Sequence, residues 1–441
     1  MSGYSDRSVA IVGSGPGGMY VAQALLEKAP GCKIDIIDRL PSPFGLIRGG
    51  VAPDHQKTKR VDQKYTQTIT ENNNVRYVGN IALGRDVSLN ELSAIYDSVV
   101  LAYGAPYDNK LGIPGEDKVG VFGSNAFVGW YNCHPDFKDL SPNLNISTAA
   151  VIGIGNVAID VARVLSRTPM EMATTDIADY AMTDIDAATL KDIYMFARRG
   201  PLEAACTNNE LKEMGLLDAA TTVVDGSILP DDMPESMDDR EKKVRMRILD
   251  TLKVLSQAKA NEKRRTVHIE FFASPIEILG GERVEGIRME RTKVESGRCV
   301  GTGDTFDIRC EMVITCIGSR AEAIEGIPFN ERSGIVKHQD GRVSPGVYAA
   351  GWVKRGATGT IGTNRLDSYA VTDLLIADFC GEKKPGPEKL NNLLNERKLQ
   401  SVSFDDWLII KMLEETAATA PSPRKKFSTI EDMIAGLNAA R

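Results

Sequence analysis

The sequence predicts an α/β protein with two doubly wound, Rossmann-like nucleotide-binding domains. The main observation is a short apolar run that leads into a glycine-rich turn and then into a helix-patterned segment, and it occurs twice, with turns at residues 13–18 and 153–158. The length is consistent with two domains, because 441 residues correspond to two to four domains at roughly 100–200 residues each.

The first unit begins with Val9–Val12, a run too short and too β-branched for a helix. The turn GSGPGG follows it, and residues 19–28 then have helical spacing, which ends at Pro30-Gly31. Residues 33–38 form a second apolar run that ends in Asp38. Strand, helix and strand make one βαβ unit of a parallel sheet.

The second unit repeats this order. Ala149–Ile152 predicts a strand, Ile159–Leu165 a helix, and Ile193–Ala197 the partner strand, which ends in Arg198-Arg199-Gly200. The crossover is long, and the Ala-rich stretch at residues 169–191 predicts an inserted helical excursion.

Two proline-containing stretches suggest how the domains are divided. Residues 106–114 are predicted to form a linker into the second domain. Residues 328–334 are predicted to form the linker back into the first domain, since Val347–Gly351 resembles another buried strand. We therefore expect a discontinuous first domain, residues 1–106 and 332–441 with a C-terminal tail, around a second domain of residues 107–331. Residues 240–265 predict a charged, solvated helix.

Composition excludes several functional classes. Lys and Arg number 53 against 60 Asp and Glu, a net charge of −7, so nucleic-acid binding through a global basic field is not expected. The seven cysteines are scattered without a C-x-x-C pair, which indicates reduced thiols and no metal site of that kind. No apolar run reaches 18 residues, and we expect neither a transmembrane helix nor a transit peptide.

The first glycine turn fits a dinucleotide site. Gly13, Gly15 and Gly18 occupy the three positions of G-x-G-x-x-G, and a pyrophosphate would lie on free amides at the helix start. Asp38 stands at a strand end, where its carboxylate can accept hydrogen bonds from a ribose. The alternative is a Gly-rich turn without a ligand.

The second turn has Gly153, Gly155 and Ala158, the G-x-G-x-x-A variant. Arg198-Arg199 at the end of the next strand favour the 2′-phosphate of NADP over NAD, with a pair of surface arginines as the alternative. Two dinucleotide sites suggest a flavin enzyme that takes hydride from NADPH.

The motifs GSGPGG (13–18), PFGLIRGGVAPDH (43–55), GNVAIDVAR (155–163), RRGP (198–201), ELKEMG (210–215) and GWVKRGATGTIGT (351–363) resemble the adrenodoxin reductase branch of the ferredoxin–NADP⁺ reductases. The similarity extends in order to about residue 380. It implies FAD in the first domain, NADP(H) in the second, and a ferredoxin-type iron–sulfur protein as electron acceptor.

The resemblance also implies cofactor contacts. Those to FAD are Gly13, Gly15, Gly17, Gly18, Asp38, Leu46, Leu83, Trp352, Gly359, Thr360 and Ile361. Those to NADP(H) are Ile154, Gly155, Asn156, Val157, Arg198, Arg199 and Glu210, and Gly359 approaches both nucleotides. Departures from the family pattern are Gly17 for Ala, Asp38 for Glu, and the residues 206–209 before Glu210.

Two residues are candidates for a role at the reacting rings. Glu210 in the matching motif approaches the nicotinamide, and the loop His55 lies nearby. By themselves, a loop histidine is more often structural and a helix carboxylate more often solvated. No nucleophile and no metal are expected, because hydride transfer needs alignment of two rings and exclusion of water.

We therefore expect an NADPH-dependent ferredoxin or adrenodoxin reductase in the cytoplasm, with the mitochondrial matrix as the alternative. Other readings are a flavin subunit of a larger oxidoreductase complex, or a nucleotide-binding redox regulator without a ferredoxin acceptor. The sequence leaves open the identity of the ferredoxin, the direction of electron flow and the oligomeric state, for which a monomer is one possibility.

Overall fold

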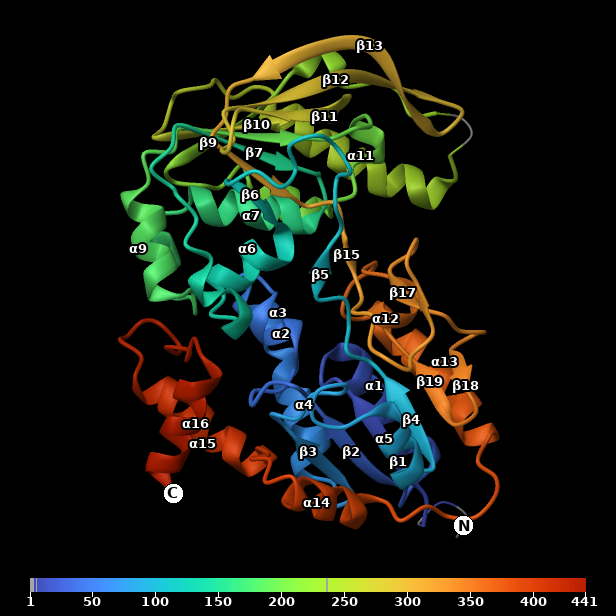
Figure 1. Cartoon of the computed structure of the whole chain (residues 1–441). Coiled ribbons are helices and arrows are strands. Elements are labelled where there is room, and N and C mark those ends of the chain that lie inside the picture. Colours follow the sequence, from blue (N-terminus) through green and yellow to red (C-terminus); the bar gives the residue numbers. More distant parts are fainter. Residues whose placement is uncertain (1–3, 5, 235–236) are drawn as a thin grey trace. The chain divides into compact units, whose positions relative to one another are not determined.

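The computed structural model describes residue 4, residues 6–234 and residues 237–441, and the chain forms two compact units (Figure 1). The first unit contains Met1–Tyr107, Asn132–Pro135 and Gly318–Arg441, and the second contains Asp108–Tyr131 and Asp136–Ile317. The chain re-enters the first unit at Gly318, earlier than the expected residue 332. The reason is that the proline-containing stretch expected as a linker forms a small hairpin, β16 (Phe329–Asn330) and β17 (Ile335–Val336), within this unit.

The first unit is built on a six-stranded sheet. Its order is β18 (Arg342–Ser344), β19 (Val347–Ala349), β4 (Ser98–Leu101), β1 (Ser8–Val12), β2 (Lys33–Ile37) and β3 (Val75–Val78). All neighbours pair in parallel except β18 with β19. The chain leaves β1 for β2 on one side, while β4 lies on the other, so the order reverses at the carboxyl end of β1, where α/β sheets bind ligands.

Helices cover both faces of this sheet because successive residues of β1 point to opposite sides. Val9 and Ile11 belong to one hydrophobic cluster and Ala10 and Val12 to another. On the first face α1 (Pro16–Lys28) packs beside α13 (Thr363–Ala377). On the second lie α5 (Leu89–Ile95) and α14 (Pro387–Glu396), which pack together. The remaining helices of this unit are α2 (Leu46–Gly49), α3 (Gln56–Lys59), α4 (Val61–Thr70) and α12 (Trp352–Arg355).

The C-terminal tail is an integral part of the first unit. Its helices are α15 (Phe404–Thr416) and α16 (Ile430–Ala440), and they contribute Trp407, Ile410 and Leu437 to the core cluster that contains β1. The fully buried Glu414 receives a hydrogen bond of 2.8 Å from Arg48 Nη1. The tail is thereby tied to α2.

The second unit has an entirely parallel sheet. Its order is β6 (Val121–Gly123), β14 (Met312–Thr315), β7 (Thr148–Ile152), β8 (Asp192–Phe196), β10 (Arg265–Glu270) and β9 (Ala220–Val224). Its helices are α6 (Ser124–Tyr131), α7 (Asn156–Ser166), α8 (Pro169–Met172), α9 (Asp179–Ala187), α10 (Asn208–Glu213) and α11 (Asp239–Leu255). The expected helical excursion consists of α8 and α9.

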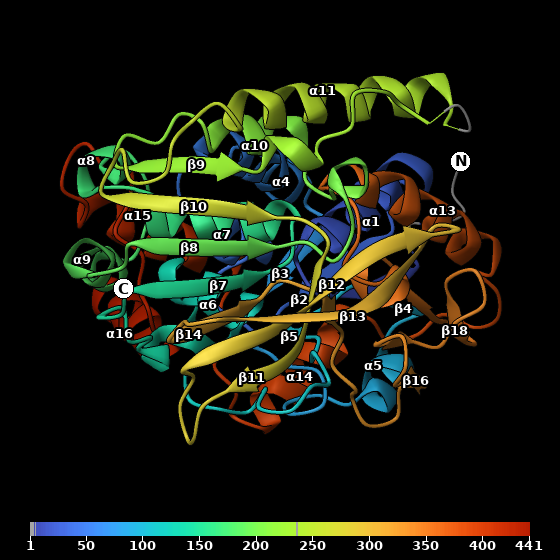
Figure 2. The same cartoon turned by 90° about the horizontal axis from the view of Figure 1, so that it is seen from above.

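A second, antiparallel sheet belongs to this unit and was not anticipated. It consists of β11 (Ala273–Leu279), β12 (Gly286–Glu295) and β13 (Arg298–Ile308). In Figure 2 the arrows of β8 and β10 mark the carboxyl ends of these strands, and β12 and β13 lie on that side of the unit. The expected charged helix at residues 240–265 ends already at Leu255, and Arg265 belongs to β10 instead.

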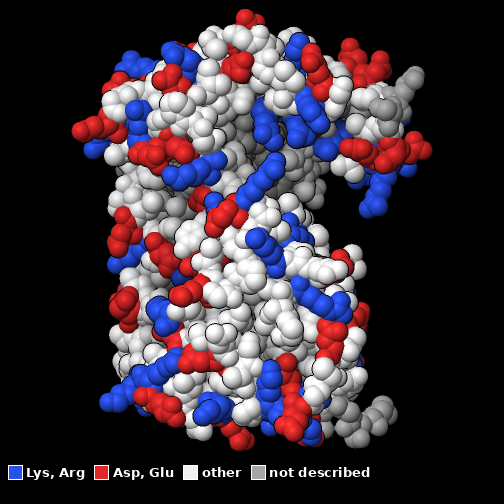
Figure 3. Space-filling view, turned by 45° about the vertical axis from the view of Figure 1, so that its right-hand side comes forward, with Lys and Arg blue, Asp and Glu red and all other residues white. Residues whose placement is uncertain are grey.

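Short elements complete the chain: β5 (Tyr107–Asp108), β15 (Ser319–Arg320) and the 3-10 turns Pro135–Leu140, Pro201–Glu203 and Gly226–Ile228. None of the described helices is both long and apolar enough to span a membrane. On the face drawn in Figure 3, basic and acidic side chains are interspersed, as a small net charge implies.

Candidate functional site

The first glycine loop lies between β1 and α1 and combines tight packing with open space. Gly13 has φ +107°, and a Cβ there would lie 2.5 Å from the carbonyl oxygen of Ala102. Gly15 has an ordinary φ of −68°, and a Cβ on it would meet no heavy atom within 4 Å. No side chain caps α1, so its first amides can receive an anion in that space.

Asp38, just after β2, is already engaged with this loop. Its carboxylate accepts hydrogen bonds from the Ser14 amide (2.9 Å), the Ser14 hydroxyl (2.5 Å) and the Leu40 amide (3.0 Å). An ionised carboxylate can accept about four. A ribose hydroxyl would use the remaining capacity.

The segment around Trp352 meets the same loop. A Cβ on Gly17 would lie 3.3 Å from Gly351 Cα, and the Ser368 hydroxyl donates to Gly17 O at 2.9 Å. The Trp352 indole N–H donates to Thr358 O at 3.2 Å, and Gly359, with φ +79°, leads through Thr360 and Ile361 to α13. This helix begins at Thr363, whose hydroxyl accepts a hydrogen bond from the Thr360 amide at 3.1 Å.

The two predicted leucines lie in different surroundings. Leu46 begins α2 and is 39% exposed, and a Cβ on its neighbour Gly45 would lie 3.2 Å from Gly15 Cα. Leu83 instead packs against the hydrophobic cluster on the other face of the sheet, which contains Val87. The first unit thus gathers the glycine loop, Asp38, the start of α2 and the Trp352 segment, and Leu83 lies with a different cluster.

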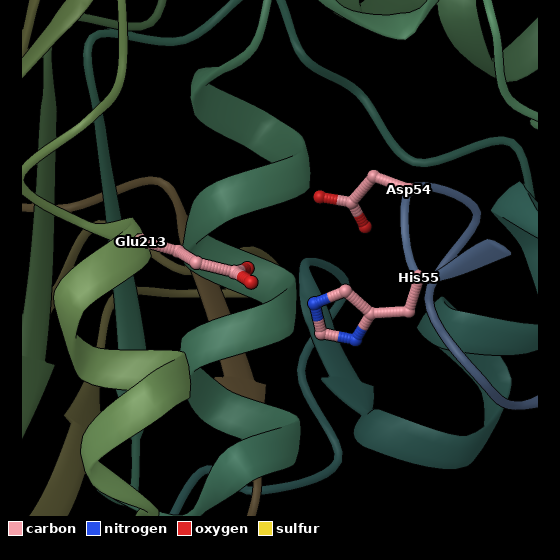
Figure 4. A group of neighbouring side chains, drawn as sticks. All are labelled: Asp54, His55 and Glu213. Atoms are coloured by element: carbon pink, nitrogen blue, oxygen red, sulfur yellow. The ribbon is translucent and has the colours of Figure 1, made fainter. Parts of the chain in front are cut away.

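His55 is the residue that precedes α3, and its side chain is half-buried. Its amide donates to Ala52 O at 3.0 Å, and its carbonyl accepts from Thr58 at 3.0 Å. Figure 4 shows Asp54 and His55 on this turn. The backbone of His55 is therefore fixed, while the imidazole extends from the turn.

The second glycine loop, between β7 and α7, repeats the first. Gly153 has φ +135°, and a Cβ there would lie 2.5 Å from Cys316 O, whereas a Cβ on Gly155 would meet nothing within 4 Å. Ile154 is buried, Asn156 begins α7, and Val157 is 44% exposed. The side-chain oxygen of Asn156 accepts from the Thr207 amide at 2.7 Å, which joins this loop to the start of α10.

Arg198 and Arg199 follow the end of β8 after one residue, Ala197, and have exposed side chains. Among the residues that the structure describes, neither guanidinium forms an ion pair. The strand-end position expected for them is the observed one, and two cations without carboxylate partners can meet a phosphate.

Glu210, in the first turn of α10, is not a solvated carboxylate. Its Oε2 lies 3.4 Å from Nη1 of Arg163, a fully buried residue of α7. The same guanidinium lies 2.8 Å from Asp160 and 3.2 Å from Glu213, whose position on α10 is visible in Figure 4. Sequence reasoning missed these three residues, although Asp160 and Arg163 have the i, i+3 spacing of a helical ion pair.

A cavity of about 580 Å³ lies beside α10. It is lined by residues 204–209 and by the first half of α11, including Arg240 and Arg247. Arg245 of α11 donates from Nη1 to Ala204 O at 2.6 Å and so closes one side. The two walls are about 40 residues apart in sequence, and no local motif could reveal the cavity.

The cysteines agree with the expected reduced state. All seven are free thiols. Burial raises the pKa of Cys206 to about 11 and the pKa of Cys32 and Cys310 to about 12. These thiols are protonated at neutral pH, and a thiolate is the reactive form.

Comparisons with known proteins agree with this arrangement. The family model of the pyridine nucleotide-disulphide oxidoreductases matches residues 7–195. The mitochondrial NADPH:adrenodoxin oxidoreductase of Arabidopsis thaliana is 39% identical over 460 residues, covering 97% of this chain and 94% of the relative. The NADPH-ferredoxin reductase FprA of Mycobacterium tuberculosis is 36% identical over 97% of this chain and 98% of the relative.

A solved structure shows the same fold. That of M. tuberculosis FprA in complex with NADPH is 34% identical, covers 98% of this chain and 99% of that chain, and has a TM-score of 0.91. Both the sequence and the fold match along nearly the whole length. The chain therefore belongs to the adrenodoxin reductase family of NADPH-dependent ferredoxin reductases.

Proposed function

We propose that this enzyme binds FAD in its first unit and NADP(H) in its second, and that it passes electrons from NADPH to a ferredoxin-type iron–sulfur protein. The observation that carries this is the duplicated loop geometry. In each unit a glycine at positive φ packs under the loop, where a Cβ would clash, and a second glycine faces open space at an uncapped helix start.

The bound flavin would supply the chemistry, since flavins accept two electrons together and release them singly. The chain's own task is to bind and orient. Gly15 and Gly155 would let the two pyrophosphates reach backbone amides, and Asp38 would accept from the FAD ribose. Trp352 and residues 359–361 would border the flavin, with Leu46 and Leu83 as the remaining contacts implied by the family.

Coenzyme choice would rest on Arg198 and Arg199, whose exposed guanidinium groups have no described carboxylate partner. Ile154, Asn156 and Val157 would hold the pyrophosphate side. Glu210 would accept from the nicotinamide carboxamide and so select the face of the ring, and His55 is the first unit's candidate for a contact with the reacting rings. This role is geometric and needs no proton transfer.

An absorption spectrum tests the proposal directly. The purified protein should be yellow with one FAD per chain, and anaerobic NADPH should bleach it. A colourless protein that FAD cannot reconstitute would refute the scheme. Cytochrome c reduction with NADPH should accelerate when ferredoxin is added, whereas a flavin subunit of another complex or a redox regulator would show no acceleration.

Coenzyme choice has its own test. Replacing Arg198 and Arg199 together by Gln should weaken NADPH much more than NADH, because only NADPH carries the 2′-phosphate. Each charge-assisted hydrogen bond lost should cost roughly 1.5–3 kcal/mol. An equal loss of affinity for NADPH and NADH would show that the two arginines do not bind the 2′-phosphate.

The cellular location is part of the proposal. Relatives are named as mitochondrial in Arabidopsis thaliana and Bos taurus, and others come from Mycobacterium tuberculosis. We propose the cytoplasm, with the mitochondrial matrix as the alternative. Fractionation with an antibody to the chain distinguishes the two.

A further inference from the structure

The backbone carbonyl of Arg198 receives two side-chain hydrogen bonds from distant parts of the second unit. The hydroxyl of Thr292, on β12, donates to Arg198 O at 2.8 Å. The thiol of Cys299, on β13, donates to the same oxygen at 2.9 Å. Two donors on one carbonyl, from residues 94 and 101 positions away, fix this peptide group more firmly than a turn alone would.

The neighbouring carbonyl is held by the same part of the fold. The Phe272 amide donates to Arg199 O at 3.2 Å, and the Thr292 amide donates to Phe272 O at 2.9 Å. Phe272 has φ +55°, a conformation that a bulky residue adopts only where its surroundings enforce it. The backbones of both arginines therefore rest on Phe272 and Thr292.

An irregularity in β12 accounts for the direction of Thr292. The pairing of β12 with β13 shifts register between Glu290 and Thr292, and such a bulge redirects the following side chain. Thr292 is only 8% exposed. A buried hydroxyl needs a partner, and it finds one in Arg198 O.

We infer that Thr292 and Cys299 are positioning residues for coenzyme selectivity, because they hold the Arg198 backbone in the orientation that aims the guanidinium pair at a 2′-phosphate. This inference rests on the proposed role of Arg198 and Arg199. The side chains of the arginines are exposed and have no described ion pair to orient them. The fixed backbone sets the direction in which each side chain leaves its Cα and so limits where the two guanidinium groups can reach. Binding by a preorganised fork loses less entropy.

The test is Thr292→Val, which keeps the side-chain shape and removes the donor. In the FAD-loaded enzyme, the NADP⁺ affinity is measured by spectral titration and the KM is measured with NADPH. The affinity should fall and the KM should rise by about three- to tenfold, the equivalent of one lost hydrogen bond. The constants for NAD⁺ and NADH should change by less than twofold, since no 2′-phosphate is present. The kcat with NADPH should stay near its original value.

Three variants serve as controls. Thr292→Ser keeps the donor and should restore the selectivity. Thr302→Val removes the bond from the Thr302 hydroxyl to Arg291 O at 2.9 Å and the bond that this hydroxyl accepts from the Asp304 amide at 3.3 Å. Neither bond touches Arg198, so this variant should leave selectivity unchanged. Cys299→Ala should act like Thr292→Val but more weakly, because a thiol is the poorer donor.

The outcomes separate the two claims. Thr292→Val could weaken the binding of NADPH and NADH equally, or it could leave the ratio of the two affinities unchanged and only lower the melting temperature. Either result would overturn the inference and leave the reductase assignment intact. If the Arg198 and Arg199 double variant itself kept its NADPH selectivity, the proposed clamp would fail, and the inference with it.

Discussion

At the residue scale, Arg163 is the least expected feature of the candidate site. It is fully buried, and its guanidinium faces the carboxylates of Asp160, Glu210 and Glu213. A buried cation requires such partners. Three carboxylates lie around one guanidinium, and the contact orients Glu210.

The first prediction concerns Glu210. Replacing it by Ala should slow the reduction of the flavin by NADPH in stopped-flow while the FAD content stays intact. The cost should be roughly 1–3 kcal/mol if a buried hydrogen bond to the carboxamide is lost. The exposed Glu262 of the same unit supplies the control Glu262→Ala. An unchanged rate in Glu210→Ala would remove this residue from the site.

A second prediction links Glu210 to His55. If both act on the same bound ring, the double variant Glu210→Ala with His55→Gln should lose less activation free energy than the sum of the single variants. Stopped-flow reduction with NADPH measures all four proteins. Strict additivity would show that the two side chains act independently.

Sequence reasoning reached Glu210 and the glycines but not their surroundings. Gly13 and Gly153 are recognisable because the turn requires positive φ and close approach to a neighbouring carbonyl. Arg163 is not recognisable, because its spacing with Asp160 is equally typical of a surface ion pair. Its burial depends on how α7 packs against α10, which is a property of the tertiary fold.

At the element scale, α11 is half core and half surface. Ile248, Leu249, Leu252 and Leu255 are buried, whereas Lys243, Val244, Met246 and Arg247 are exposed. In Figure 3 the projecting part of the second unit carries both acidic and basic side chains, and further basic side chains lie beside it. A basic helix segment on an acidic protein is a suitable place for an acidic electron-transfer partner.

The third prediction uses this helix. The expected docking surface for ferredoxin consists of five basic residues. Lys243 and Arg247 are exposed and Lys242 is half-buried, and Lys212 and Arg245 complete the set. Replacing Lys242, Lys243 and Arg247 by Gln should raise the KM for ferredoxin, and turnover with ferredoxin should fall as salt rises. Reduction of a small neutral quinone is the control and should hardly change. Salt-independent turnover with ferredoxin would contradict the docking surface.

The fourth prediction concerns α5 and α14. Hydrogen bonds from the Ser88 backbone and from Arg397 lower the pKa of Glu91 from its ordinary 4.5 to about 2. A lowered pKa in the folded state stabilises the protein above pH 4.5, and this contribution is lost as the pH falls toward 2. The effect is small because the pair is on the surface.

Glu91→Gln keeps the cap on α5 and removes the charge. Its stability in urea should fall below that of the original protein at pH 7, and the difference should shrink as the pH is lowered from 5 toward 2. Glu396→Gln, an exposed position on α14, is the matched control. A difference that is constant with pH would mean that the ionised pair contributes nothing.

The elements predicted best are those whose apolar residues recur with one clear period along the sequence. The strand Ser8–Val12 is as expected, and β7, α7 and β8 agree to within a few residues. The sheet of β11, β12 and β13 was missed because β13 is largely exposed and the buried residues of β11 and β12 are scattered among polar ones, so no strand carries a continuous apolar run. Its importance for Arg198 could be found only from the hydrogen bonds.

At the scale of the whole molecule, the chain builds one kind of glycine loop twice, and the sequence of the second unit interrupts that of the first. The order of the motifs allowed the discontinuous first unit to be predicted, whereas the point of return did not follow from the linker-like composition of residues 328–334. Pro and Gly mark breaks in secondary structure. Only tertiary contacts decide which unit a hairpin joins.

The last prediction separates the two sites. Gly15 and Gly155 have negative φ, and a Cβ on either would meet nothing within 4 Å, so Ala at either position should fold normally. A methyl group should nevertheless obstruct a pyrophosphate that approaches the backbone. Gly15→Ala should therefore weaken FAD retention, and Gly155→Ala should weaken NADP⁺ binding, each by at least about tenfold, the equivalent of about 1.4 kcal/mol.

Bound FAD after gel filtration and NADP⁺ binding by calorimetry give the two readouts, and circular dichroism checks folding. Gly281→Ala, in a loop where a Cβ also meets nothing within 4 Å, is the matched control and should leave both cofactors bound. Each substitution touches one unit. If only Gly15→Ala loses FAD and only Gly155→Ala loses NADP⁺ affinity, one nucleotide is assigned to each unit. The reverse pattern would exchange the two assignments, and no effect from either variant would exclude both loops as pyrophosphate sites.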